Sequence, residues 1–162
     1  DGKVLIAEAE AEIESNEKLL ADGAAIIIMA HFGRPKNGFD PSLSLAPVAK
    51  HLSKILNREV IFTQELLGEK VSEIARNLKN GDVFLLENIR FYPGETKGDK
   101  ELAKQLADLG DCYINDAFGA AHREHSSTAT IAQFFPNDKY FGLCCFLFGW
   151  WIYLFFGPNF GY

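Results

Sequence analysis

The stretch DVFLLENIRFYPGE, residues 82–95, decides the fold predicted for this chain. Its apolar first half is short enough for a buried strand, and turn signals stand on both sides, Asn80-Gly81 before it and Pro93-Gly94 within it. The strand would therefore end by carrying Arg90 into a loop.

Two further apolar runs end in the same way. Residues 24–30 lead into His31 and Arg34, and residues 112–115 lead into a loop that carries Arg123. In open sheets of parallel strands, ligands bind beyond the carboxyl ends of the strands. Three strand ends that each deliver a cation, in a chain of net charge -6, predict an anion site at one edge of a sheet.

The candidate binding residues are the cations of these three loops, namely His31, Arg34, Arg90, His122, Arg123 and His125. The planar guanidinium group matches phosphate or carboxylate better than an ammonium group does. Any one of these residues alone would be more typical of a surface ion pair or a satisfied loop hydrogen bond. The repetition of the same chemistry at three strand ends favours a binding site instead.

Other polar residues near these loops have a second interpretation. Glu87 and Glu95 are interpreted as counter-ions of the arginines rather than as a general acid and base, because no nucleophile lies near them. Asn115 and Asp116 could either orient the cationic side chains or cap the loop, and Cys112 is expected in the core. We expect no catalytic residue in this chain.

The sequence also lacks the patterns of cofactor and metal sites. It contains neither a G-x-x-x-x-G-K-[ST] phosphate loop nor a G-x-G-x-x-G motif, and no Cys/His group has zinc spacing. We therefore expect no nucleotide cofactor and no metal ion in this chain.

Strands and helices alternate along the chain. We expect strands at 24–30, 60–63, 82–87 and 112–115, and helices at 7–22, from Ser44 to Leu56, at 71–78 and from Asp99 to Gly110. Residues 7–22 are strong helix formers that end at Gly23, a typical helix C-cap. The alternation predicts an α/β fold, a doubly wound parallel sheet of about four strands flanked by helices.

Composition narrows the function classes. With 162 residues, 48% of them hydrophobic, the chain is long enough for one compact domain, and its net charge of -6 argues against nucleic acid as the partner. Three cysteines, two of them adjacent, suit a reducing cytoplasm. The chain opens on Asp1, as a fragment or a processed product would.

The end of the chain differs from the rest. Residues 140–157 carry no charge, but the uncharged run at 141–156 is 16 residues long, shorter than the roughly 20 that span a membrane, so membrane insertion is not expected. We therefore divide the chain into a substrate-binding domain, 1–139, and a hydrophobic tail, 140–162. The tail could instead make the chain a non-catalytic interaction protein, or be an extension without function.

Four ordered motifs, AHFGRPK at 30–36, SLAPVA at 44–49, LLENIRFYPGE at 85–95 and NDAFGAAHREHSS at 115–127, resemble the N-terminal domain of phosphoglycerate kinase. The resemblance covers about residues 18–142. It implies that His31, Arg34, Arg90 and Arg123 hold the phosphate end of 3-phosphoglycerate or of a similar small phosphorylated acid, with His122 and His125 beside them.

The same resemblance implies a reaction and a missing part. Family members transfer a phosphoryl group reversibly between 1,3-bisphosphoglycerate and ADP in glycolysis, and their C-terminal domain binds Mg-ATP or ADP. That nucleotide-binding domain, the opening Asp-Phe-Asn-Val-Pro strand and the arginine that follows it are not found here. We therefore expect a sheet without its first strand, part of a substrate site, and no activity from this chain by itself.

Overall fold

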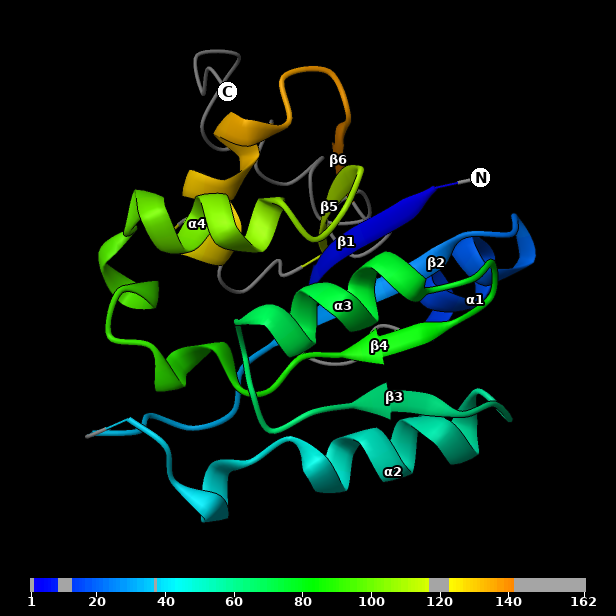
Figure 1. The fold of residues 1–162 in the computed structure, drawn as a ribbon, viewed down its shortest axis with the longest axis horizontal. Coiled ribbons are helices and arrows are strands. Elements are labelled where there is room, and N and C mark those ends of the chain that lie inside the picture. The colour runs from blue at the N-terminus through cyan, green and yellow to red at the C-terminus, as the bar shows by residue number, and fades with distance from the viewer. Residues whose placement is uncertain (1, 9–12, 37, 117–122, 142–162) are drawn as a thin grey trace, which may run out of the picture.

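The computed structural model describes residues 2–8, 13–36, 38–116 and 123–141. Within these ranges six parallel strands form one sheet in the order β3-β4-β2-β1-β5-β6 (Figure 1). The strands are β1 (Lys3–Glu8), β2 (Ala25–Ala30), β3 (Val60–Phe62), β4 (Val83–Leu85), β5 (Cys112–Asp116) and β6 (Lys139–Phe141). The α-helices described are α1 (Ile13–Ala21), α2 (Ala46–Ile55), α3 (Glu69–Asn77) and α4 (Lys100–Ala107).

Helices cover both faces of this sheet, so the predicted doubly wound α/β fold is confirmed. On one face, α3 and α4 pack with Leu5, Ile27 and Phe84 in the larger core cluster, and Figure 1 shows α3 in front of the strands. On the other face, α2 and the end of α1 pack against Ile26 and Ile28. The apolar run of β2 thus supplies side chains to both layers, as expected for a strand buried on two sides.

The expectation of about four strands without the opening strand is wrong. Residues 3–8 form β1, which lies between β2 and β5 and pairs with both in parallel. Leu5 is fully buried and Ala7 is 2% exposed. The alanines and glutamates that follow Ile6 favour a helix, but hydrogen bonding along both edges of the strand and burial of its side chains outweigh that weak local preference.

The helix predicted at 7–22 is confirmed only in its second half. The described helix is α1, residues 7–8 belong to β1, and residues 9–12 lie outside the described ranges. Gly23 has φ +81° and its N–H donates to the Leu20 carbonyl at 3.1 Å, so it ends the helix as predicted. The Asp99 side chain accepts from the N–H groups of Glu101 and Leu102, which confirms the predicted N-cap of α4.

A sixth strand spans the boundary that we expected between the domain and the tail, at residues 139 and 140. Lys139, Tyr140 and Phe141 form β6, which pairs in parallel with Tyr113, Ile114 and Asn115 of β5. The rest of the expected tail, residues 142–162, lies outside the described ranges. No helix in the described part of the chain is long and apolar enough to cross a membrane.

Candidate anion-binding site

The residues that follow β2 and β4, and those from Arg123 onward, lie at the same edge of the sheet, where they line one cleft. The register shows the common edge directly, since Glu8 at the end of β1 is opposite Ala30 of β2 and Asp116 of β5. His31 and Arg34 follow β2, Arg90 follows β4, and Arg123 and His125 come after β5. Parallel topology therefore brings together cations that lie far apart in the sequence.

These loops enclose an open cleft of about 400 Å³. Its cationic lining comes from Arg34, Lys36, Arg90, Arg123 and His125. The other lining residues are small, aromatic or proline side chains and one threonine: Pro35, Gly38, Phe91, Tyr92, Pro93 and Thr96. Such a cleft suits a small ligand of strong negative charge with a short carbon skeleton.

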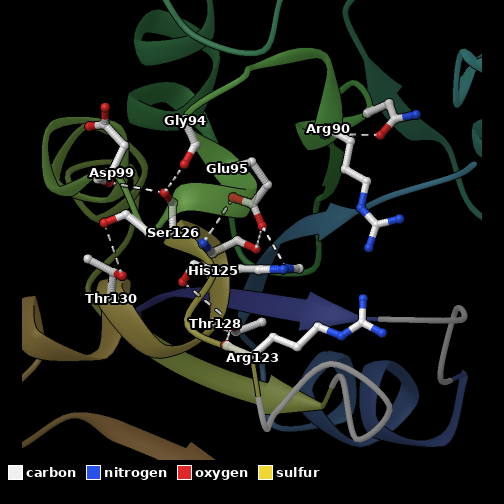
Figure 2. Close-up of polar contacts among 12 residues, drawn as sticks. Arg90, Gly94, Glu95, Asp99, Arg123, His125, Ser126, Thr128 and Thr130 are labelled. Carbon is white, nitrogen blue, oxygen red and sulfur yellow. Dashed lines mark hydrogen bonds and ion pairs between the residues drawn. The ribbon is translucent and has the colours of Figure 1, made fainter. Parts of the chain in front are cut away.

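Arg90 is the most constrained of the three arginines. Its Nη1 donates to the Gly33 carbonyl at 2.9 Å, and its Nε is buried without a hydrogen-bond partner among the described residues. Burial and the nearby charge of Arg123 lower the pKa of Arg90. Figure 2 shows the guanidinium groups of Arg90 and Arg123 on the same side of the His125 ring. A buried donor that lacks an acceptor is ready to bind an anionic oxygen.

Arg34 and Arg123 are exposed, and neither forms an ion pair with a carboxylate in the described part of the chain. The same holds for Arg90. The charges of Arg34 and Arg123 both disfavour the charge of Arg90, so both side chains are near enough to repel it. Positive charge is thus concentrated in the cleft without an ion-pair partner among the described residues, which favours an anionic ligand.

His31 is half-buried and is not among the residues that line the cleft. Burial lowers its pKa from the ordinary 6.5 to about 4, and the positive charges of Arg90, His125 and Arg123 act in the same direction. These effects place His31 next to the cationic cluster, where it is neutral at physiological pH. A neutral imidazole can donate a hydrogen bond to an anion without adding to the repulsion between the arginines.

The interpretation of Glu87 as an arginine counter-ion is wrong. Its buried carboxylate accepts from Ser44 Oγ at 2.7 Å, from Leu45 N at 2.8 Å and from Asn88 N at 2.7 Å. Two of these donors lie at the start of α2, where the helix dipole favours a negative charge. Glu87 therefore fixes the loop between β2 and α2 to the end of β4, which local sequence could not reveal because Ser44 and Leu45 are 43 and 42 residues away.

Asn88 completes this connection. Its Nδ2 donates to the carbonyls of Phe32 and Leu43, at 2.7 and 3.0 Å, and its Oδ1 accepts from Arg90 N at 3.1 Å. Gly33 in the same loop has φ +65°, and a Cβ there would lie 2.7 Å from Leu43 Cδ2. The loop that carries Arg34 is thus placed against the loop that carries Arg90 by part-buried hydrogen bonds, in a turn whose positive φ at Gly33 favours glycine.

Glu95 is also buried, and it faces a different partner from the one expected. Its carboxylate accepts from Ser127 N at 3.1 Å and from Ser127 Oγ at 2.7 Å, while Arg90 acts on it only through longer-range charge. Burial raises the pKa of Glu95, and the two Ser127 bonds and Arg90 oppose this rise. The main role of Glu95 is therefore to bind Ser127, and its role as a counter-ion of Arg90 is secondary.

The remaining expectations have mixed outcomes. His122 lies outside the described ranges. Asn115 and Asp116 are buried, and both interpretations of them remain predictions. The expectation that Cys112 is a core residue is wrong, because β5 leaves it partly exposed; burial, followed by Asp138 and Asp111, still raises the pKa of its thiol.

Some residues of the cleft were not predicted. Lys36 and Thr96 line it, and Ser44, Asn88 and Ser127 hold its loops. Lys36 could have been found, because it follows Arg34 in the same loop. The serines carry no such signal, since their partners are distant in sequence.

Within the described ranges no group of three or more His, Cys, Asp or Glu side chains could hold a metal ion.

The fold and the cleft together define a doubly wound α/β protein with a cationic cleft at the carboxyl edge of its sheet. The family model of phosphoglycerate kinase matches residues 6–145, and the chain belongs to this family. The predicted resemblance is thereby confirmed.

Curated relatives agree with the family assignment. Phosphoglycerate kinase from Pseudothermotoga lettingae is 54% identical over 114 residues, which are 70% of this chain and 29% of the relative. Phosphoglycerate kinase from Thermosipho africanus is 54% identical over 118 residues, or 73% of this chain and 29% of the relative. The chain thus spans less than one third of the length of these relatives.

Solved structures share the fold. The structure of phosphoglycerate kinase from Coxiella burnetii matches with a TM-score of 0.77 and 30% identity, over 95% of this chain and 41% of that one. The enzyme from Pyrococcus horikoshii has a TM-score of 0.80 at 22% identity, over 98% of this chain and 44% of that one, and supports the fold alone.

Proposed function

We propose that this chain is the substrate-binding part of a phosphoglycerate kinase, and that its cleft binds the phosphate group of 3-phosphoglycerate. The observation that carries the proposal is the convergence of Arg34, Arg90 and Arg123, from three separate loops, on one cleft with no carboxylate partner among the described residues. Family membership supplies the identity of the anion, because the cleft alone selects only charge and size.

Each cation has a separate part in this proposal. Arg90 donates from its buried Nε, while Arg34 and Arg123 line the same cleft as exposed residues. His31 and His125 contribute hydrogen bonds beside them, and His122 is expected to join them from outside the described ranges. Together these groups neutralise and orient the substrate, which is the main contribution of a protein to phosphoryl transfer.

The complete reaction needs parts that this cleft does not supply. We propose that Mg-ATP or ADP binds a separate C-terminal domain, as the resemblance implies, and that this chain by itself binds substrate in the cytoplasm without transferring the phosphoryl group. The alternative role in association through residues 140–157 is not adopted. Of that segment the structure describes Tyr140 and Phe141, both in β6, and no contact there favours it.

Isothermal titration of 3-phosphoglycerate into the purified chain at low salt tests this function. We expect Arg34→Ala and Arg123→Ala each to weaken binding by about tenfold, since a hydrogen bond to a charged group contributes about 1.5–3 kcal/mol. Arg76→Ala is the matched control. Lys3 Nζ donates to the Arg76 carbonyl, which places Arg76 beside the start of β1, at the opposite edge of the sheet. Equal losses in all three variants, or no binding by the wild-type chain, would contradict the proposal.

A further inference from the structure

Glu95 is a buried carboxylate that belongs to one cationic loop and is hydrogen-bonded to another. It is 1% exposed, and its own N–H donates to the Tyr92 carbonyl at 3.0 Å, in the turn that follows Arg90. Its side chain crosses to Ser127, in the π-helical turn η5 (Ser126–Thr130) that follows Arg123. Short π-helical turns are frequent at functional sites.

The two loops are attached at further points around this carboxylate. Ser126 Oγ donates to the carbonyls of Gly94 and Asp99 at 3.1 and 3.0 Å, as Figure 2 shows. Gly98 has φ +65°, and a Cβ there would lie 2.6 Å from the Glu124 carbonyl oxygen. The backbones of the two loops therefore approach as closely as glycine allows, with Glu95 and Ser126 as the polar connections between them.

The connection continues from Ser127 to the cleft. Thr128 Oγ1 and His125 N both donate to the Arg123 carbonyl, at 2.9 and 2.8 Å, and so fix the backbone from which the Arg123 side chain extends. His125 Nδ1 lies 3.8 Å from Glu95 Oε1, and Figure 2 shows the guanidinium groups of Arg90 and Arg123 on one side of the His125 ring. A displacement of Ser127 would therefore move both Arg123 and His125.

Electrostatic repulsion between the two loops explains why they need this attachment. Arg90 and Arg123 are like charges on separate loops, and the charge of Arg123 disfavours that of Arg90 when no anion is present, whereas the charge of Glu95 favours it. Two repelling loops separate unless other interactions hold them together. The contacts at Glu95 oppose this separation from beneath the cleft, where they do not occupy the ligand site.

We infer that Glu95 is a positioning residue that, through Ser127, holds the Arg123 loop against the Arg90 loop and thereby sets the spacing of the two guanidinium groups before the anion binds. The inference rests on the proposed function for the identity of the anion. Glu95 itself is not among the residues that line the cleft.

A double-mutant cycle on the full chain tests the inference, with 3-phosphoglycerate as the probe. We expect Glu95→Ala to weaken binding by about tenfold, and Arg123→Ala to cost about tenfold in the wild-type background but at most about twofold in the Glu95→Ala background. Arg34→Ala is the matched control, because its loop is attached through Glu87 and Asn88 instead. Its effect should be the same in both backgrounds.

Conservative variants separate positioning from general loss of structure. The amide of Glu95→Gln can accept from Ser127 N and donate to Ser127 Oγ, so this variant should bind within about threefold of wild type. Ser127→Ala keeps the backbone bond and removes the hydroxyl, and should reproduce part of the coupling. It replaces Glu95→Ala in the cycle if that variant does not fold. An Arg123→Ala effect that is equal in all backgrounds would overturn the inference.

Hydrogen exchange of the ligand-free chain gives a readout that does not depend on binding. We expect the amides of residues 123–128 to exchange about tenfold faster in Glu95→Ala or Ser127→Ala, with α2 unchanged. Unchanged exchange at 123–128 would refute the positioning role even if 3-phosphoglycerate binds. Faster exchange in a chain that does not bind 3-phosphoglycerate would refute the proposed function and leave the positioning role supported.

Discussion

The two edges of the sheet use the same residue type in opposite ways. At the amino edge, Arg76 pairs with Glu69 at 2.6 Å, and Arg58 Nη1 donates to the Gly81 carbonyl at 2.6 Å. At the carboxyl edge, Arg34, Arg90 and Arg123 meet no carboxylate among the described residues, although Glu87 and Glu95 are close by in sequence. A binding site is therefore identified by several charges that converge on one cleft without a carboxylate partner, since Arg58 alone also bonds only a backbone carbonyl.

Glu87 and Glu95 explain how the carboxyl edge remains cationic. Both carboxylates are buried and accept from serine hydroxyls and backbone N–H groups rather than from arginine. Their charge is used to fix the loops, and the arginines remain available to a ligand. Acidic residues at this edge therefore support the site without forming ion pairs with its arginines.

The largest expected effect separates a buried acid of the carboxyl edge from an exposed acid at the first residue of α3. Glu87→Ala should lower the free energy of unfolding by about 3–5 kcal/mol, because it leaves buried donors at Ser44, Leu45 and Asn88 without an acceptor. Urea denaturation measures the change. Glu69→Ala, whose side chain is 84% exposed, is the control and should cost less than about 0.5 kcal/mol. Similar losses in the two variants would break the comparison.

The next effect compares arginines in ligand binding. Arg90→Ala should weaken 3-phosphoglycerate binding by about 100-fold, or about 2–3 kcal/mol, since it removes a buried charged donor. Arg90→Lys keeps the charge but loses the planar fork, and should lie between this variant and wild type. Arg58→Ala, at the amino edge, should change affinity less than about twofold. Calorimetric titration decides the order, and an Arg58→Ala loss equal to that of Arg90→Ala would contradict it.

A smaller effect concerns the protonation of His31. Because its pKa is about 4 in the folded chain and 6.5 ordinarily, the unfolded chain binds more protons between these values. The contribution of His31 to stability is therefore complete above about pH 6.5 and is lost as the pH falls through about 4. NMR titration of the His31 ring should show a midpoint near 4.

The same titration tests the proximity of His31 to the cleft. Arg90→Ala removes a neighbouring positive charge and should raise the pKa of His31, and bound 3-phosphoglycerate should raise it further. Arg76→Ala should leave it unchanged. An unchanged pKa of His31 in Arg90→Ala would show that the charge of Arg90 does not act on His31.

The smallest effect belongs to the amino edge. Arg76 and Glu69 are 62% and 84% exposed, so Arg76→Ala should change the free energy of unfolding by less than about 0.5 kcal/mol. Urea denaturation measures this change as well. A loss above about 1.5 kcal/mol would show that the amino edge depends on its ion pair more than its exposure indicates.

The sequence by itself determined the α/β class and the positions of β2, β3, β4 and β5, because each is a short apolar run bounded by turn signals. It also determined which loops carry the cations. Since parallel strands present their carboxyl ends at one edge, Arg34, Arg90 and Arg123 could be assigned to a common site before any contact was known.

Two features became known only from the tertiary structure: which strand lies in the middle of the sheet, and which groups the buried carboxylates of Glu87 and Glu95 bind. β1 is a strand because β2 and β5 bond to both of its edges, although the residues after Ile6 favour a helix, and β6 is three residues that only β5 stabilises. Glu87 and Glu95 are 42 and 32 residues from the backbone N–H groups of Leu45 and Ser127 that they bind. Local sequence encodes propensity and strand ends, whereas pairing between distant groups is fixed only when the chain closes around them.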